Sequence, residues 1–375
     1  MSQIAEGQIT EEAVERLRER IGTFNRPSFY GMGQFNEYAS IDAIRHFAMG
    51  IGDANPLWTD LEHGRRSRYG ENIAPPSFLY SVYWCSGRTG GLPGVHGFHA
   101  GNEWNFHRPI KLNDRITVQE QFTGLDEKKS QFAGRIFIQS SVSTYRNQNS
   151  EILAECKGWQ IRAERRAARE RGKYKREPYK YTVAEMEAIE EAALNEEFRG
   201  ANPRFWEDVT VGEECPPIVK GPLSTGDLSA FVVGCIGGLA HGAALREFKR
   251  HPAWGYRDEK SGALEAVIRV HDAGGTAEAA GLPMAYDYGC QRMCWIGQLP
   301  TNWMGDDGFL KNLSGRLHLF NYVGDTTWVK GSVTGKRVED GEHLVDLEIR
   351  TENQLGERTS DGKATVVLPT TSKTL

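Results

Sequence analysis

Residues 271–289 read HDAGGTAEAAGLPMAYDYG, a histidine followed 18 residues later by a glycine that precedes an apolar segment. Residues 58–76 read WTDLEHGRRSRYGENIAPP and repeat this spacing, with a tryptophan at the first position and a proline at the last. Later landmarks recur in the same order: Asn113-Asp114 and Gly324-Asp325, then Asn147-Gln148 and Asn353-Gln354. The chain is therefore predicted to consist of two related halves.

Length, charge and cysteine content restrict the class of protein. The 375 residues suffice for two domains with cores of their own, and a net charge of −5 disfavours nucleic-acid binding. No run approaches 18 apolar residues, and the charged N-terminus lacks the apolar core of a signal peptide, so no membrane span is expected. The six cysteines lack zinc spacing, which favours reduced thiols in a cytoplasmic protein without a metal site.

Hydrophobic periodicity predicts the same order of elements in each half. The first half is expected to contain helices at 9–21, 41–49 and 77–88, then strands between 102 and 163. The second half is expected to contain helices from Ser224 or Thr225 to Val232 and at 290–299, then strands between 315 and 368. A segment at 239–269 has no counterpart in the first half.

We predict three parts: an N-terminal half (1–161), a helical linker (162–204) and a C-terminal half (205–375). The basic run in the linker is compatible with a DNA-binding arm, but an acidic helix follows it at once, which favours a solvated connector. In each half we expect one long helix wrapped by an antiparallel sheet. Two such units paired edge to edge give an α+β double hotdog architecture.

The quoted residues resemble the MaoC-like (hydratase 2) family of acyl-thioester hydratases and dehydratases. The signature of that family is G-D-x-N-P-(apolar)-H, with a glycine that opens the hotdog helix 18 residues after the histidine. The resemblance implies that the Asp and His activate a water, which adds to the β-carbon of an enoyl thioester. It also implies that the glycine N–H binds the thioester oxygen as the enolate develops.

The first half departs from this signature at two positions. Residues 52–58 read GDANPLW, so Asp53 and Asn55 match but Trp58 replaces the histidine. Pro76 stands where the glycine belongs, and proline has no N–H to donate. This half resembles the substrate-holding partner of paired hydroxyacyl dehydratases, so Trp58 and Pro76 are expected to shape the substrate pocket.

The second half keeps the histidine and the glycine as His271 and Gly289 but lacks the aspartate, since Ala266 occupies its position and Ile268 that of the asparagine. Three carboxylates are candidates for the missing acid: Asp287, ranked first because it lies at the helix entry, then Glu265 and Asp53. Tyr286 and Tyr288 flank Asp287 and are expected to line the substrate pocket.

Structural interpretations compete with these roles. His271 would then be an ordinary solvated histidine, Asp53 and Asn55 a helix-terminating turn, and Gly289 a site of close helix packing. His96, His99 and His107 are expected at a strand edge as surface or interface groups, with His99 a minor candidate for the ligand channel.

The sequence favours a hydratase or dehydratase that adds or removes water across the 2,3-bond of an enoyl-CoA, with a bulky acyl chain. No cofactor is expected besides the CoA thioester substrate, and the protein is expected to be a homodimer. A hotdog thioesterase would need a carboxylate on the central helix, and neither 77–88 nor 290–299 contains one. A non-catalytic acyl-CoA binder or inactive subunit is the other alternative, supported by the split motif.

Overall fold

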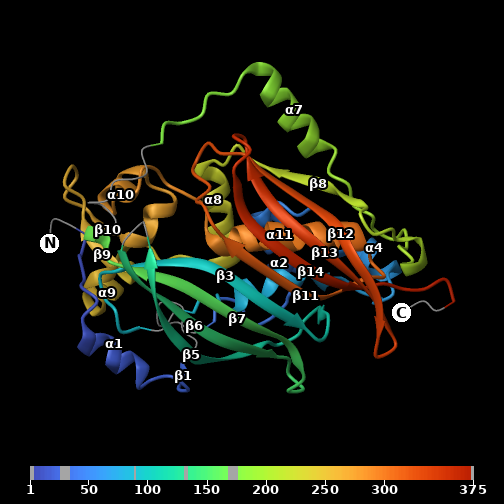
Figure 1. Cartoon of the computed structure of the whole chain (residues 1–375), viewed down its shortest axis with the longest axis horizontal. Helices are drawn as coiled ribbons and strands as arrows, with labels where there is room; N and C mark the ends of the chain where they lie inside the picture. Colours follow the sequence, from blue (N-terminus) through green and yellow to red (C-terminus); the bar gives the residue numbers. More distant parts are fainter. Residues whose placement is uncertain (1–3, 26–33, 88–89, 131–133, 168–175, 373–375) are drawn as a thin grey trace.

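One antiparallel sheet of ten strands joins the two halves in the part of the chain that the structure describes (Figure 1). In this computed structural model, residues 4–25, 34–87, 90–130, 134–167 and 176–372 are described. The strands follow one another across the sheet as β1 (Phe24–Asn25), β5 (Thr117–Ser130), β6 (Gly134–Arg146), β7 (Ile152–Ala163), β3 (His96–Phe106), β11 (Phe309–Leu317), β14 (Arg358–Val367), β13 (Glu342–Asn353), β12 (Thr327–Glu339) and β8 (Glu214–Lys220). The predicted α+β double hotdog is confirmed.

The halves meet at strands β3 and β11, which pair antiparallel from Asn105 opposite Asn312 to Gly101 opposite Arg316. The side chains add a further bond, because Asn312 Nδ2 donates to Asn105 Oδ1 at 2.6 Å. Each strand would otherwise be an exposed edge with unpaired backbone groups. The pairing therefore places the end of β3 that carries His96 and His99 next to the second half.

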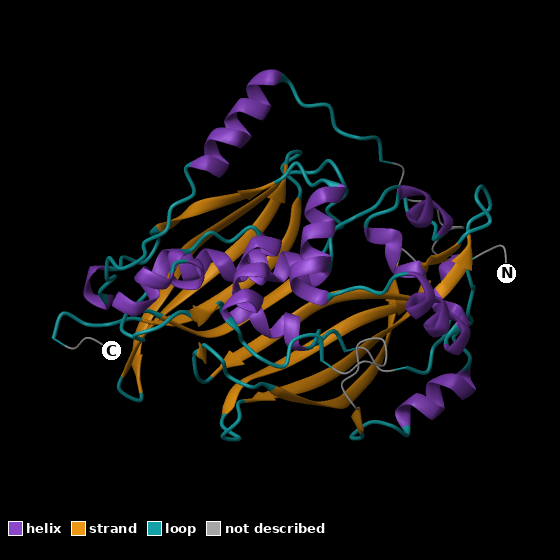
Figure 2. Ribbon diagram, turned by 180° about the vertical axis from the view of Figure 1, so that it is seen from behind, coloured by secondary structure: helices purple, strands orange, loops and turns teal. Residues whose placement is uncertain are grey.

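Helix α11 (Gly289–Met304) is the central helix, and the sheet curves around it (Figures 1 and 2). It runs five residues beyond the predicted end at 299, although Pro300 cannot donate the usual backbone hydrogen bond. The Thr301 hydroxyl donates to Gln298 O at 2.9 Å, and burial on every side holds the last turn in place. The helix ends where Gly305 adopts a φ of +74°.

The predicted helix 77–88 is wrong in length. A 3₁₀ turn (η1, Pro76–Phe78) leads into the four-residue α5 (Leu79–Val82), and Tyr83 is already extended. Side chains attach the following residues to the sheet: Tyr145 Oη donates to Tyr83 O at 2.7 Å, and Asn102 Nδ2 to Cys85 O at 2.6 Å. These long-range bonds replace the last helical turns and bring Trp84 towards α11.

The helices predicted from Ile41 and from Ser224 or Thr225 begin at the expected residues. The Ser40 hydroxyl caps α2 by accepting a bond from Ala43 N, and α8 begins after Ser224, which forms a capping box with Asp227. The acidic linker helix is present as α7, at the periphery in both views, whereas 168–175 of the basic run lie outside the described residues. Besides η1, α5, α11 and those within residues 239–279, the described helices are α1 (Glu11–Arg18), α2 (Ile41–Ile51), α3 (Pro56–Thr59), α4 (Leu61–Arg66), α7 (Val183–Leu194), the short η2 (Trp206–Asp208) and α8 (Thr225–Phe231). Helix α8 continues as the π-helical η3 (Val232–Ile236).

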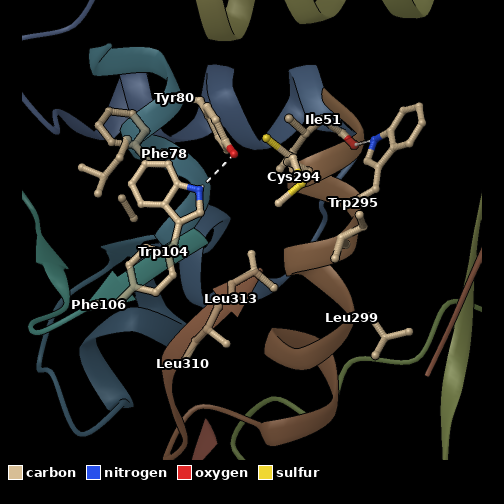
Figure 3. Close-up of a cluster of buried hydrophobic side chains, with 14 of the residues drawn as sticks. Ile51, Phe78, Tyr80, Trp104, Phe106, Cys294, Trp295, Leu299, Leu310 and Leu313 are labelled. Carbon is tan, nitrogen blue, oxygen red and sulfur yellow. Dashed lines mark hydrogen bonds between the residues drawn. The ribbon is translucent and has the colours of Figure 1, made fainter. Parts of the chain in front are cut away.

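The main core lies between α11, α2 and the first-half entry turn (Figure 3). Two tryptophans anchor it through their indole N–H groups. Trp295 donates to Ile51 O at 3.1 Å, and Trp104 donates to the Tyr80 hydroxyl at 2.9 Å. A buried indole N–H requires an acceptor, so these bonds fix the register of α11 against α2 and of β3 against the 76–82 segment.

The unmatched segment, 239–269, folds into small elements at the end of the molecule where α1 lies (left in Figure 1). It comprises α9 (His241–Arg250), η4 (Pro252–Trp254), β9 (Gly255–Arg257) and β10 (Leu264–Ala266), and η5 (Val267–His271) and α10 (Gly274–Ala279) follow. β9 and β10 form a separate two-stranded sheet, and β2 (Ile73–Ala74) pairs with β4 (Ile110–Lys111) in another. The added segment therefore lies where it can enclose the site predicted around His271.

Candidate functional site

A cavity of about 820 Å³ lies between the first half and the added segment of the second half. The first half contributes residues around Trp84 and His99, and the second half contributes the wall from Ala266 to His271, together with Tyr286. This volume falls within the range of ordinary small-molecule sites. Ala266 and Ile268 stand where the MaoC-like signature has its aspartate and its asparagine. The cavity wall is therefore apolar at these two positions.

His271 closes the short helix η5 and is only 9% exposed. Its ring stacks on Tyr288 with centroids 3.9 Å apart and lies 4.5 Å from the Tyr286 ring. Its Nδ1 lies 2.9 Å from the Tyr286 carbonyl oxygen. The histidine is therefore a buried cavity-wall group held by the residues that precede α11.

The hydrogen bond to Tyr286 determines the tautomer of His271. A carbonyl oxygen only accepts, so Nδ1 carries the proton and Nε2 keeps its lone pair. Burial lowers the pKa of His271 to about 4, and hydrogen bonds to backbone carbonyls oppose that shift only in part. At neutral pH the residue is an uncharged imidazole that can accept a proton at Nε2.

Gly289 is the first residue of α11, where backbone N–H groups lack helical acceptors. His99 and Leu317 lie closest to it, because a Cβ added at position 289 would lie 2.8 Å from both His99 Nδ1 and Leu317 Cδ1. The cavity-wall imidazoles of His271 and His99 thus lie against Tyr288 and Gly289, respectively. The N-terminal turn of the helix is well placed to stabilise a developing negative charge.

The structure does not bring the predicted acids to His271. Asp287 is 1% exposed and forms a two-pronged ion pair with Arg292, Oδ1 to Nη2 at 2.5 Å and Oδ2 to Nε at 2.8 Å. Glu265 pairs with Arg269 at 3.0 Å. Among the described residues, no carboxylate forms a hydrogen bond or ion pair with His271.

The Asp53 carboxylate stays within its own loop in the first half. It accepts bonds from Asn55 N and from Trp58 Nε1, both at 3.0 Å, so the indole takes the partner position that the signature gives to histidine. Asn55 in turn caps α3 by accepting from Leu57 N at 3.0 Å, as the helix-turn interpretation expected. Burial raises the pKa of Asp53 to about 6, against the Asn55 bond and the charge of Lys220.

The four residues predicted to shape one substrate pocket are divided between two places. Trp58 and Pro76 line a slot of only about 30 Å³ between the first half and residues 301–310 of the second, room for little more than a water molecule. Tyr286 lines the large cavity, and Tyr288 lies behind it against His271 and Trp84. The first half therefore contributes to the large cavity through other residues.

The sequence did not single out Trp84, and it predicted His96 to be a surface or interface group. His96 is 6% exposed and lines the cavity between the halves, so it is not a surface group, whereas His107 is exposed. Trp84 reaches His99 and Tyr288 because Tyr83 leaves the helix. A helical pattern gave no signal for that break.

No group of three or more His, Cys, Asp or Glu side chains is arranged to hold a metal ion in the described part of the chain. No single described helix has both the length and the apolar character required to cross a membrane, although the bent pair Thr225–Ile236 and His241–Arg250 passes that test jointly.

Comparison with known proteins gives a family match for the first half. Residues 31–156 match the family described as FAS1-like, dehydratase domain region. A UPF0336 protein from Streptomyces coelicolor is 34% identical over 83 residues, 20% of this chain and 55% of the relative. A probable enoyl-CoA hydratase alpha subunit from Thermomonospora curvata is 26% identical over 164 residues, 38% of this chain and 50% of the relative. The chain thus spans about half the length of these curated relatives.

Solved structures extend the likeness to the whole fold. A MaoC-like dehydratase aligns with a TM-score of 0.64 at 17% identity, covering 95% of this chain and all of its own. A putative MaoC domain protein dehydratase from Chloroflexus aurantiacus gives 0.58 at 12% identity, covering 94% and 96%. A conserved hypothetical protein from Mycobacterium tuberculosis, described as a double hotdog, gives 0.54 at 9% identity, covering 93% and 96%. The chain is therefore a double hotdog protein with the fold of the MaoC-like dehydratases, and its residues 31–156 are similar to the FAS1-like dehydratase family.

Proposed function

We propose that the protein is a hydro-lyase that adds water across the 2,3-bond of an enoyl-CoA, or removes it in reverse. The observation that carries this proposal is the uncharged His271 imidazole, which lines the large cavity at the N-terminal turn of α11. The likeness of the first half to the FAS1-like dehydratase family supports the reaction class.

In the proposed reaction the water oxygen bonds to the β-carbon while His271 Nε2 takes one of its protons. The electron pair of the double bond moves to the thioester oxygen, which the Gly289 N–H and the α11 N-terminus stabilise. His271 then returns the proton to the α-carbon, and the enzyme regains its starting state. General base catalysis of this kind contributes roughly 10²- to 10⁴-fold to the rate.

The cavity supports a bulky or branched acyl chain as substrate. Its volume of about 820 Å³ exceeds what a four-carbon acyl group fills, and Ala266 and Ile268 add apolar wall. We expect kcat/KM for a long or ring-bearing enoyl-CoA to exceed that for crotonyl-CoA by at least tenfold, since each buried methylene adds about 0.8 kcal/mol. Hydration is followed by loss of enoyl absorbance. A clear preference for crotonyl-CoA would contradict the bulky-substrate proposal while leaving the reaction class standing.

The fall of activity at low pH tests whether His271 is uncharged at neutral pH. Because burial lowers its pKa from 6.5 to about 4, the base stays unprotonated in the folded protein until the pH falls through about 4. We therefore expect kcat/KM to hold down to roughly pH 5 and to fall below it. The unfolded chain takes up this proton first, so His271 also costs stability as the pH falls from 6.5 towards 4. A fall of activity near pH 6.5 would indicate a solvated histidine.

The structure also bears on the thioesterase alternative. Helix α11 carries no Asp or Glu, and its one charged residue, Arg292, is held by Asp287. The carboxylate that would direct water at the thioester carbonyl is therefore missing from this helix. Release of free thiol from acyl-CoA at a rate matching hydration would favour the thioesterase instead.

A further inference from the structure

We propose that His99, from the first half, supplies the second acceptor that orients the attacking water and so takes the place of the missing acid. The inference rests on the proposed hydration. It assigns His99 Nδ1 to one hydrogen of the water and His271 Nε2 to the other. The two imidazoles come from opposite halves and line one cavity.

The hydrogen bonds around Asn102 fix the tautomer of His99. Asn102 Nδ2 donates to the Cys85 carbonyl oxygen at 2.6 Å, which identifies the other amide atom, Oδ1, as the acceptor. That oxygen lies 2.6 Å from His99 Nε2, so Nε2 carries the proton and Nδ1 keeps its lone pair. The Tyr80 hydroxyl donates to the same oxygen at 2.7 Å and accepts from Trp104 Nε1 at 2.9 Å. This buried network leaves Asn102 a single orientation.

The position of His99 places this lone pair beside the proposed thioester site. Nδ1 lies 2.8 Å from where a Cβ of Gly289 would be, so the ring lies directly on the first residue of α11. The Trp84 indole N–H points at Nδ1 from 3.4 Å, a long contact that a water at ordinary hydrogen-bond distance can replace. Ala266 carries no carboxylate, and the carboxylate that does line the cavity, Glu247, is paired with Arg250 at 2.7 Å.

Both imidazoles are uncharged at the start of the reaction, so each can accept one hydrogen of the water. Burial lowers the pKa of each to about 4, so neither begins the reaction as an acid. A water molecule presents two hydrogens and needs two acceptors to be held with its oxygen facing the β-carbon. The C–O bond forms as one hydrogen moves to His271 Nε2, which later returns it to the α-carbon. The hydrogen on His99 Nδ1 stays on oxygen as the product hydroxyl, so atoms and charge balance.

The test compares His99→Ala, His99→Asn and a control, His107→Ala, which removes an exposed histidine just beyond the same strand. We expect His99→Ala to lower kcat about 100-fold with KM changed less than threefold, as for one lost preorganised contact to the reacting water. His99→Asn keeps a carbonyl oxygen near the position of Nδ1 and should regain about a tenth of the wild-type rate. His107→Ala should match the wild type.

Nuclear magnetic resonance of the wild-type protein gives a readout independent of activity. The ¹⁵N shifts of His99 should report an Nε2–H tautomer at pH 7, and Nδ1 should shift when an enoyl-CoA is added. If the wild type hydrates enoyl-CoA and His99→Ala is folded and retains more than a third of wild-type kcat, the inference about His99 fails and the hydratase proposal stands. An Nδ1–H tautomer also overturns the inference, even where an alanine variant does not fold. A wild type inert towards every enoyl-CoA overturns the proposed function and the inference with it.

Discussion

His271→Ala is expected to lower kcat for enoyl-CoA hydration by roughly 10²- to 10⁴-fold, the contribution of a general base. The imidazole lines the cavity, and its Nδ1 proton is held by the Tyr286 carbonyl oxygen. Its Nε2 is the atom proposed to take the proton from water. Because the Gly289 N–H is unchanged, the variant should still bind the CoA thioester within a few-fold of the wild-type affinity. Steady-state kinetics and calorimetric binding measure the two quantities separately.

His251→Ala provides a matched control for that result. His251 also lines the cavity, but its ring stacks on Trp254, whereas the His271 ring stacks on Tyr288 at the start of α11. Its replacement should leave kcat within about threefold of the wild type, the scale of a change outside the reacting groups. Equal losses in the two variants would show that the cavity wall, and not one base, supports the reaction.

Arg292→Leu is expected to reduce the free energy of unfolding by about 3–5 kcal/mol, the usual cost of leaving one partner of a buried ion pair without the other. Arg292 is 2% exposed and binds both oxygens of Asp287 as well as the carbonyl oxygens of Leu319 and Thr359. Without it, the Asp287 carboxyl, whose pKa burial already raises, has no cation to stabilise its charge. Urea denaturation of the wild type and the variant measures the difference.

The double variant Asp287→Asn/Arg292→Leu distinguishes the contribution of the ion pair to the free energy of unfolding from that of side-chain packing. The double variant removes the stranded charge, so it should recover at least 1 kcal/mol relative to Arg292→Leu alone, within the usual range of coupling between contacting residues. A loss below 1 kcal/mol for Arg292→Leu would contradict a structural role for the pair. In that case Asp287 would again be a candidate for the acid that acts with His271.

The fold was predictable because its signals are local and repeated. The two 18-residue spacings, the alternating strands and the capping serines Ser40 and Ser224 each depend on residues near one another in the chain, and the structure places them as expected. The first-half helix was misjudged because contacts from distant strands override its helical pattern. Tyr145 and Asn102 bind the backbone of residues 83 and 85 and hold it out of the helix.

The site was less predictable because its parts come from distant segments. Asp287 ranked first as the acid by its place at the helix entry, but Arg292 lies five residues further on and binds it. That pair had a signal in the sequence, since an arginine within an apolar helix requires a partner. No pattern within the chain indicates that His99 lies against Gly289, because that contact follows from the pairing of β3 with β11.

Mass spectrometry of the products formed from an enoyl-CoA in H₂¹⁸O tests the central claim most directly. The account predicts an intact 3-hydroxyacyl-CoA that carries one ¹⁸O on its β-carbon with the wild type, and unchanged enoyl-CoA with His271→Ala. An ¹⁸O-labelled free acid with released CoA would contradict it, and so would labelled hydroxyacyl-CoA formed at the wild-type rate by His271→Ala.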